Sequence, residues 1–320
     1  MTSLCRTILS FSTVSLMALS SVGVKAQVTN TLNPNQIALL HWYHANQTTE
    51  FAVGSIPTDL AFDGDNVWVT NGGSSNIMKL RASDGALLAT VTLSGNPSYI
   101  AFDGANVWVT IPDGNSVSKV RASDGAVLGN FSVGNFPEGV AFDGHDVWVA
   151  NEFSQSVTKL RASDGKVLGT FPVGTAPLAV AFDGTNVWIV NSSSNNVTVL
   201  RASDGSVFGT FVTGSQPTAI AFDGTNMWIA NSSGNSVSEL RATDGATLGT
   251  VAVGLDPSGV VFDGINIWVT NTISRTVTEL RPSTGKAVGV FSVGFSPTGM
   301  AFDGANIWVA NSGGSNVSKL

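Results

Sequence analysis

An all-β fold, a seven-bladed β-propeller of four-stranded antiparallel blades, is predicted by three observations on this sequence. The tripeptide Phe-Asp-Gly recurs seven times at intervals of 40 residues, from Phe62 to Phe302, without insertion or deletion. A tryptophan follows each phenylalanine by six residues, and a proline precedes it by five. Each unit also holds four short apolar runs separated by turn residues. A fixed period of about 40 residues with four strands per unit is typical of propeller blades.

The four strands follow in order along one unit, residues 97–136. Residues 98–102 form a short apolar run after a proline, which suits the start of a strand. Residues 107–110 are β-branched and aromatic, a strong strand signal. Residues 117–121 alternate apolar and polar, as a half-buried strand does, and an Asp-Gly turn leads into the fourth run at 127–133. We call these strands A, B, C and D.

The two ends of the chain indicate how the ring closes. Strands A, B and C occur seven times, whereas strand D occurs six times after the first unit begins. The missing copy lies near the N-terminus, where residues 51–54 have the register of residues 131–134. Residues 47–53 are therefore expected to complete the last blade beside residues 316–320. Such closure removes an exposed sheet edge.

The N-terminal residues predict export. Residues 1–26 have the features of a secretory signal peptide: Arg6, an apolar stretch from 8 to 22, and Val-Lys-Ala at 24–26 as a cleavage site. An uncleaved membrane anchor is the alternative. We expect a secreted, periplasmic or cell-envelope protein with no membrane span after cleavage. Residues 27–45 are expected to form an extension with one short helix that covers one channel mouth, and residues 46–320 the propeller domain.

Composition excludes several function classes. The formal net charge is −7, which argues against a nucleic-acid partner. The single cysteine, Cys5, lies in the predicted signal peptide, so no disulfide is expected. One histidine, His145, falls within the repeats, at a turn position that other units fill with Asp, Ala, Thr or Ile. We therefore expect no catalytic residue, no metal and no cofactor.

The repeated Asp-Gly-x-Asn turns allow two interpretations. Calcium binding would need about six converging oxygen atoms, and each turn offers two side chains. Hydrogen bonding of Asp and Asn to their own backbone is the favoured interpretation.

Strand B carries a resemblance to a known family. The pattern Trp-Val-Thr/Ala-Asn, at Trp68, Trp148 and Trp308, resembles the YVTN repeat family of β-propellers, with Trp in place of Tyr. The resemblance covers roughly residues 46–320 and implies an exported seven-bladed propeller. Related propellers include NHL-repeat proteins, streptogramin lyases and propeller lactonases. Streptogramin lyases use paired histidines with a glutamate around a metal, a set that a single histidine in the repeats does not match.

Differences between the repeats suggest a binding face. The A–B and C–D turns barely vary, whereas the D–A connections and B–C loops vary most, and a meander places them together on the opposite face. Binding residues tend to lie on loops of a rigid scaffold. The large or charged residues that interrupt the small polar background there are Tyr99, Asp113, Phe136, Glu138, Glu152, Phe153, Asp256 and Arg275. The alternative is drift of loops that no turn constrains.

These observations lead to one functional prediction with two alternatives. We predict a monomeric, non-catalytic binding or scaffold protein that presents the variable face to a protein, peptide or glycan. The site is expected to centre on blades 2 and 3, with Tyr99, Phe136 and Phe153 as exposed aromatic contacts. Glu138 and Glu152 would favour a cationic or hydroxyl-rich ligand. The first alternative is a lyase or lactonase at the channel mouth, and the second is a purely structural envelope component.

Overall fold

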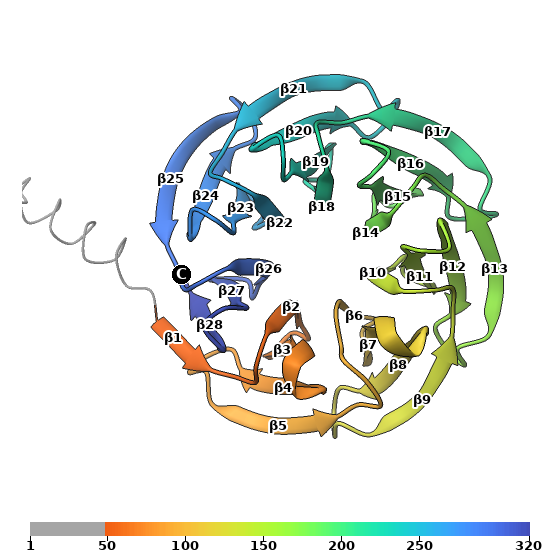
Figure 1. Cartoon of the computed structure of the whole chain (residues 1–320), viewed down its shortest axis with the longest axis vertical. Helices are drawn as coiled ribbons and strands as arrows, with labels where there is room; N and C mark the ends of the chain where they lie inside the picture. Colours follow the sequence, from red (N-terminus) through yellow and green to blue (C-terminus); the bar gives the residue numbers. More distant parts are fainter. Residues whose placement is uncertain (1–48) are drawn as a thin grey trace, which may run out of the picture. The chain divides into compact units, whose positions relative to one another are not determined.

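The computed structural model describes residues 49–320, which form a ring of seven four-stranded antiparallel sheets around a central axis (Figure 1). The predicted seven-bladed propeller is confirmed. The predicted signal peptide and the short helix of residues 27–45 lie outside the described residues. Among the described residues, no helix is long and apolar enough to cross a membrane.

Six blades are built from four consecutive strands each. Blade 1 comprises β2 (Pro57–Phe62), β3 (Asn66–Asn71), β4 (Asn76–Arg81) and β5 (Leu87–Thr92). Blade 2 comprises β6 (Ile100–Phe102), β7 (Asn106–Ile111), β8 (Ser116–Arg121) and β9 (Val127–Ser132). Blade 3 comprises β10 (Pro137–Phe142), β11 (Asp146–Asn151), β12 (Ser156–Arg161) and β13 (Val167–Pro172). Blade 4 comprises β14 (Pro177–Phe182), β15 (Asn186–Asn191), β16 (Asn196–Arg201) and β17 (Val207–Val212).

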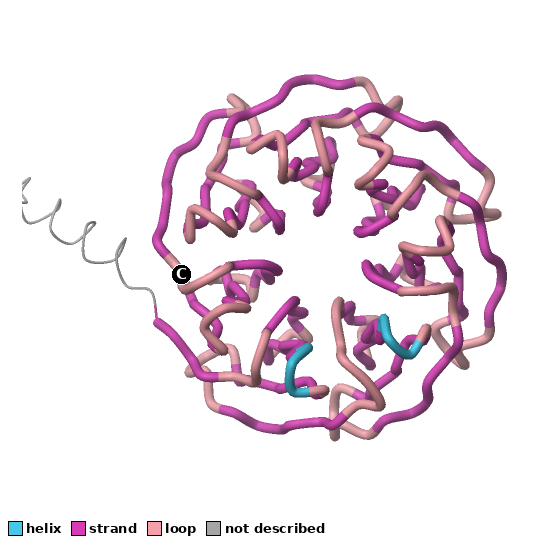
Figure 2. Tube along the Cα trace, viewed as in Figure 1, coloured by secondary structure: helices cyan, strands magenta, loops and turns pink. Residues whose placement is uncertain are grey.

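The remaining full blades repeat this order. Blade 5 comprises β18 (Pro217–Phe222), β19 (Asn226–Asn231), β20 (Ser236–Arg241) and β21 (Thr247–Ala252). Blade 6 comprises β22 (Pro257–Phe262), β23 (Ile267–Asn271), β24 (Thr276–Arg281) and β25 (Lys286–Ser292). Two short 3-10 helices, η1 (Gly72–Ser74) and η2 (Pro112–Gly114), are the helical segments of the described residues (Figure 2). Strand A of each blade lies innermost and strand D on the rim (Figure 1).

Blade 7 closes the ring with a strand from the other end of the described chain. It comprises β26 (Pro297–Phe302), β27 (Ile307–Asn311) and β28 (Asn316–Lys319), with β1 (Thr49–Ala52) paired antiparallel to β28. Phe51 lies opposite Val317 in this register, and its ring stacks on that of Trp308 with centroids 5.3 Å apart. The predicted closure by the N-terminal strand is confirmed.

The Phe-Asp-Gly turns owe their uniformity to one hydrogen-bonded arrangement. In blade 1, Asp63 Oδ1 accepts the amides of Asp65 and Asn66, and Asp63 Oδ2 accepts the indole N–H of Trp68 at 2.8 Å. The hydrogen bond from the tryptophan indole to the aspartate Oδ2 recurs in the other six blades at 2.7 Å. Each aspartate therefore fixes both its turn and its tryptophan, which confirms the backbone-capping interpretation of these turns.

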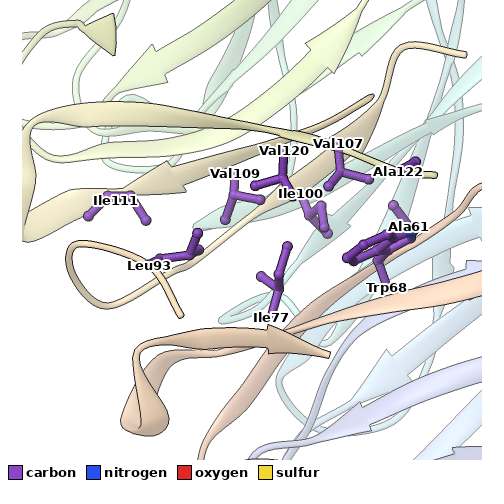
Figure 3. Close-up of a cluster of buried hydrophobic side chains, with 10 residues drawn as sticks. All are labelled: Ala61, Trp68, Ile77, Leu93, Ile100, Val107, Val109, Ile111, Val120 and Ala122. Carbon is purple, nitrogen blue, oxygen red and sulfur yellow. The ribbon is translucent and has the colours of Figure 1, made fainter. Parts of the chain in front are cut away.

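The hydrophobic core lies between adjacent blades. Figure 3 shows one such cluster, in which Trp68 and Ile77 of blade 1 pack with Ile100, Val107 and Val109 of blade 2. Six repeat tryptophans are completely buried, and the seventh, Trp268, is half-buried. Strand B is buried on both faces, which is why its central residues are mostly apolar on both sides.

Candidate functional site

A cavity of about 330 Å³ lies on the propeller axis, lined by the first residues of all seven innermost strands. These residues directly follow the D–A connections. Hydrogen bonds such as that from Glu152 N to Phe136 O tie a B–C loop to a D–A connection, as expected for one shared face. The cavity therefore lies at the end of the channel that faces the variable loops.

The first and second residues after the proline of strand A line the cavity in every blade, and in blades 3 to 7 the third residue does so too. The first position holds Thr58, Ser98, Glu138, Leu178, Thr218, Ser258 and Thr298. The second position holds Asp59, Tyr99, Gly139, Ala179, Ala219, Gly259 and Gly299. The first position thus favours a hydroxyl and the second a small side chain. Blades 1 to 4 carry every departure from this pattern.

The hydroxyl at the first position has a structural role, which we call the latch hydrogen bond. Thr58 Oγ1 donates to the backbone oxygen of Ser98 in the next blade at 2.8 Å. Equivalent bonds run from Thr218 to Pro257 O, from Ser258 to Pro297 O and from Thr298 to Thr58 O. The latch joins the innermost strands of neighbouring blades. Blades 2, 3 and 4 lack it, because Ser98 bonds elsewhere and Glu138 and Leu178 replace the hydroxyl.

The small residues at the second position have a steric cause. A Cβ atom on Gly139 would meet the backbone oxygen of Leu178 at 2.6 Å, and one on Gly299 would meet that of Thr58 at 2.7 Å. Adjacent inner strands therefore approach too closely for a side chain in these blades. Asp59 and Tyr99 depart from this rule and project larger groups at the cavity.

Asp59 is a half-buried carboxyl group that lines the cavity. Its Oδ2 accepts the amide N–H of Ile100 in blade 2 at 3.2 Å. Burial raises the pKa of Asp59 to about 7, against the opposing effect of hydrogen bonds from the Ile100 and Leu60 amides. No ion pair among residues 49–320 involves this carboxyl group.

Glu138 supplies a second carboxyl group to the same wall. Ser98 Oγ donates a hydrogen bond of 2.7 Å to Glu138 Oε2, which explains why Ser98 makes no latch. Burial raises the pKa of Glu138 to about 7, with a further contribution from the charge of Glu152 and an opposing one from the Ser98 hydroxyl. Burial also raises the pKa of Glu152, on the neighbouring B–C loop.

The phenol of Tyr99 is close enough to these acidic groups for their charges to affect its pKa. Burial raises its pKa well above the ordinary value, and the charges of Glu138, Asp59 and Glu152 raise it further. Its ring packs against the core shared by blades 2 and 3. The expectation of an exposed loop aromatic is therefore wrong for Tyr99. Strand A starts later in blade 2, at Ile100, and Tyr99 enters the channel wall instead.

The other predicted residues of blades 2 and 3 lie in the loops outside the cavity. Phe136 and Phe153 stack on each other with ring centroids 4.5 Å apart and an interplanar angle of 17°. Phe153 is 65% exposed, whereas Phe136 is half-buried. Asp113 is exposed on the B–C loop of blade 2, where Oδ1 accepts the amide of Asn96 at 3.3 Å. Phe136 and Phe153 therefore form an aromatic pair, and the Asp113 carboxyl group holds the backbone of the neighbouring loop through a hydrogen bond.

Asp256 and Arg275 belong to blade 6, on the opposite side of the ring from blades 2 and 3 (Figure 1). Arg275 is exposed and places its guanidinium 4.2 Å from the ring centroid of Phe295. The backbone amide of Asp256 donates to Asn235 Oδ1 at 2.9 Å. The structure therefore brings Tyr99, Glu138 and Glu152 together, and it does not bring Asp256 or Arg275 to them.

Sequence reasoning missed Asp59. It compared the loops of the repeats and not the innermost strand. The signal was present, since Asp59 stands where five other blades have Gly or Ala. A column-by-column comparison of strand A would have found it.

Among residues 49–320, no group of three or more His, Cys, Asp or Glu side chains is placed to hold a metal ion. His145 has an 82% exposed side chain on an A–B turn and lies 2.9 Å from Asp146 Oδ1. It is remote from the cavity, because A–B turns stand at the opposite end of strand A.

No family model and no curated protein matches the sequence. Solved structures match in fold. A streptogramin B lyase aligns with a TM-score of 0.73 and 17% identity, covering 85% of this chain and 96% of that one. The hydrazine synthase of Kuenenia stuttgartiensis also aligns with a TM-score of 0.73 and 17% identity, covering 83% and 95%. This chain therefore has the fold of a streptogramin-lyase-like propeller, and at this identity the likeness shows the fold alone.

Proposed function

We propose that this chain is an exported, non-catalytic propeller that binds a ligand at the axial cavity on its variable face. The observation that carries the proposal is the replacement of repeat residues at one place. Glu138 takes the position of a latch hydroxyl, and Asp59 takes that of a glycine or alanine. Residues that break a local structural rule without a structural gain are commonly functional.

The energetic argument concerns Glu138. A latch hydrogen bond contributes about 1 kcal/mol, and a buried carboxyl group without a cationic partner is costly. Blade 3 therefore loses a stabilising bond and gains a destabilising group. A ligand that contacts the carboxyl group offsets this loss.

Binding at the cavity agrees with its size and composition. Small-molecule sites are concave, mostly apolar and about 300–1,000 Å³ in volume, with a few polar groups that fix orientation. This cavity has apolar residues such as Leu178, Val180 and Ile220 on one side, and Asp59, Tyr99 and Glu138 on the other. The stacked Phe136 and Phe153 and the Glu152 carboxyl group lie outside the cavity, on the loops of the same face at blade 3.

The test replaces Glu138 by threonine, the residue most frequent at this position in other blades. Wild type and the Glu138→Thr variant are screened by thermal shift against soluble oligosaccharides, short peptides and alkyl amines. We expect at least one probe to stabilise the wild type and not the variant. Glu239→Gln is the matched control, because Glu239 is a half-buried carboxyl group on strand C, bonded to Asn226 Nδ2 at 2.7 Å and outside the cavity. Equal stabilisation of wild type and variant by every active probe, or no active probe, would contradict the proposal.

A lyase or lactonase at the channel mouth stays a prediction. The cavity wall contains no histidine, lysine or arginine, so acid–base chemistry there would depend on Asp59, Glu138 and Tyr99.

A further inference from the structure

We propose that the axial cavity takes a small organic cation, an alkylammonium ion whose charged group is held by Glu138 and Asp59 beside the phenol of Tyr99. This inference rests on the proposed binding function and names the chemical class of the ligand. Three features of the cavity wall support it: the unpaired carboxyl groups, the hydroxyl groups that already donate hydrogen bonds, and the apolar side chains.

The charge of the wall is negative without compensation. Asp59 and Glu138 line the cavity, Glu152 acts on Glu138 from the adjoining loop, and the lining residues include no cationic side chain. No ion pair within residues 49–320 involves any of the three carboxyl groups. Asp59 and Glu138 each accept a hydrogen bond, from Ile100 N and Ser98 Oγ, but neither has a cationic partner. Buried charges in proteins are normally paired, and a cation in the cavity supplies this missing charge partner.

Tyr99 is an independent indication of a ligand. Its side chain is half-buried, its ring packs against the blade 2–3 core, and it lines the cavity. Its hydroxyl group makes no hydrogen bond with any of residues 49–320 and is not among their fully buried polar atoms, so it is accessible from the cavity. A tyrosine hydroxyl group usually finds a hydrogen-bond partner when it is buried, as a ligand in the cavity would bury this one. An N–H donor next to the two carboxylates provides one, and the ring face adds a cation–π attraction.

The hydroxyl groups of the wall argue against two other occupants. Thr58, Thr218, Ser258 and Thr298 already donate latch hydrogen bonds, and Ser98 already donates to Glu138. A calcium ion would need about six oxygen ligands, which two carboxyl groups do not provide. A sugar needs donors as well as acceptors around it, and the engaged hydroxyl groups leave few donors. An alkylammonium ion needs acceptors alone.

The apolar side of the cavity fits an alkyl body. Leu178, Val180, Ile220, Val260 and Met300 line the wall contributed by blades 4 to 7. A ligand with a charged end and an apolar end matches both halves. Divalent metal ions and polyols have no apolar end to place there.

The test uses hexylammonium, with hexanol and hexanoate as neutral and anionic controls of similar shape. Binding is followed by the methyl resonance of Met300, which lines the cavity, with Met78 and Met227 as internal references outside it. Methyl glucoside and calcium chloride represent the hydroxyl-rich and metal occupants. We expect hexylammonium alone to shift Met300 in a saturable manner, and Glu138→Gln and Asp59→Asn each to weaken its binding at least about tenfold (the amount that one lost charge contact produces). Glu239→Gln is the control with unchanged binding.

The pH dependence adds a second measurement. Because both carboxyl groups titrate near pH 7 and an amine stays protonated below about pH 10, affinity should rise at least about tenfold between pH 5.5 and 8.5. Apart from Glu152 and Tyr99, no titratable side chain acts on Glu138 or Asp59 from the strands packed around them.

Several outcomes overturn the inference. They are a shift of Met300 by hexanol or hexanoate equal to that by hexylammonium, no binding of hexylammonium up to about 10 mM, or full binding by Glu138→Gln. Saturable binding of methyl glucoside or calcium that Glu138→Gln abolishes would overturn the cationic ligand and leave the proposed binding function intact. Failure of every probe in the wider thermal-shift screen would instead reject the binding function itself.

Discussion

Ser98 Oγ donates its hydrogen bond to Glu138 Oε2 at 2.7 Å, although the equivalent hydroxyl group of blade 1 bonds to a backbone oxygen of the next blade. One glutamate therefore alters two positions. It takes the place of a latch hydroxyl in blade 3, and it diverts the latch hydroxyl of blade 2. The innermost ring is consequently held by fewer inter-blade bonds at the point where its acidic groups gather.

The first prediction is that Glu138→Thr stabilises the ligand-free protein. Threonine can donate a latch bond towards blade 4, as Thr218 does towards blade 6, and Ser98 is freed to do the same towards blade 3. We expect a gain of about 1–2 kcal/mol in the free energy of unfolding. It comes from one net hydrogen bond, since Ser98 exchanges its bond to Glu138 for a latch, and from the loss of a buried carboxyl group. Urea denaturation measures it. A loss of stability would show that Glu138 is part of the structural framework.

The second prediction concerns pH. Burial raises the pKa of Asp59 and of Glu138 to about 7, above the values of 3.8 and 4.5 that these groups have when unperturbed. The folded protein therefore binds more protons than the unfolded chain across this interval, and its stability falls as pH rises from about 4.5 to 7. We expect a higher Tm at pH 5 than at pH 8.

The control for this measurement is the Asp59→Asn/Glu138→Thr double variant, whose Tm should change less over the same interval. Asp103 and Asp303 have lowered pKa values, because hydrogen bonds to each carboxylate outweigh the effect of burial. Their contribution is lost only as pH falls below about 4. It therefore lies outside the interval. A wild-type Tm that rises from pH 5 to pH 8 would refute the assignment.

The third prediction concerns the tryptophans. Trp188 is completely buried, and its indole donates to Asp183 Oδ2 at 2.7 Å. Trp188→Ala should cost about 3–5 kcal/mol, as large-to-small core substitutions do. Trp268 is half-buried, so Trp268→Ala should cost less. Chemical denaturation of the two variants compares them, and equal small effects would show that the repeat tryptophans are not core residues.

The fourth prediction concerns the Asp-Gly turns on the rim. Gly205 has φ of +74°, and a Cβ atom there would overlap the ring of Phe171 from the preceding blade. Gly125 has nearly the same φ, +75°, but its nearest neighbour is a methyl group of Val91 at 3.0 Å. Both alanine variants suffer the same backbone strain, which is costly at positive φ. Gly205→Ala should be the less stable of the two, and equal loss would mean that the phenylalanine moves freely.

The repeat predicted the fold because period and strand order are local properties of the sequence. The missing strand D at residues 51–54 predicted closure for the same reason. The site was harder to predict, since residues 40 apart become neighbours only around the axis. Tyr99 was therefore assigned to an exposed loop, and Asp59 was passed over as an ordinary strand residue. The 3.3 Å ion pair between Lys79 and Asp63 was not predicted either.

Arg81, at the end of β4, forms a different ion pair. Arg81 lies on the same face as the Phe-Asp-Gly turns, but it pairs with Asp84 of its own C–D turn at 2.9 Å. Both side chains are about half exposed, so the pair contributes little to stability. The Asp84 carboxylate lies three residues along the chain from Arg81, whereas Asp63 of the A–B turn accepts the indole N–H of Trp68 and pairs with Lys79.

The last prediction concerns ring closure. Deletion of residues 27–54 removes β1, and with it the ladder to β28 and the ring of Phe51. Phe51 stacks on Trp308 within blade 7 and also covers Gly85 on the rim of blade 1, so one side chain joins the two blades at which the ring closes. Its loss leaves an open sheet edge on β28, which is prone to pairing with other chains. We expect a fall in Tm of many degrees and self-association at moderate concentration, measured by calorimetry and light scattering. Deletion of residues 27–46, which keeps β1, is the matched control and should melt near the chain of residues 27–320. If the longer deletion melts within a degree or two of that control, β1 does not close the ring in solution.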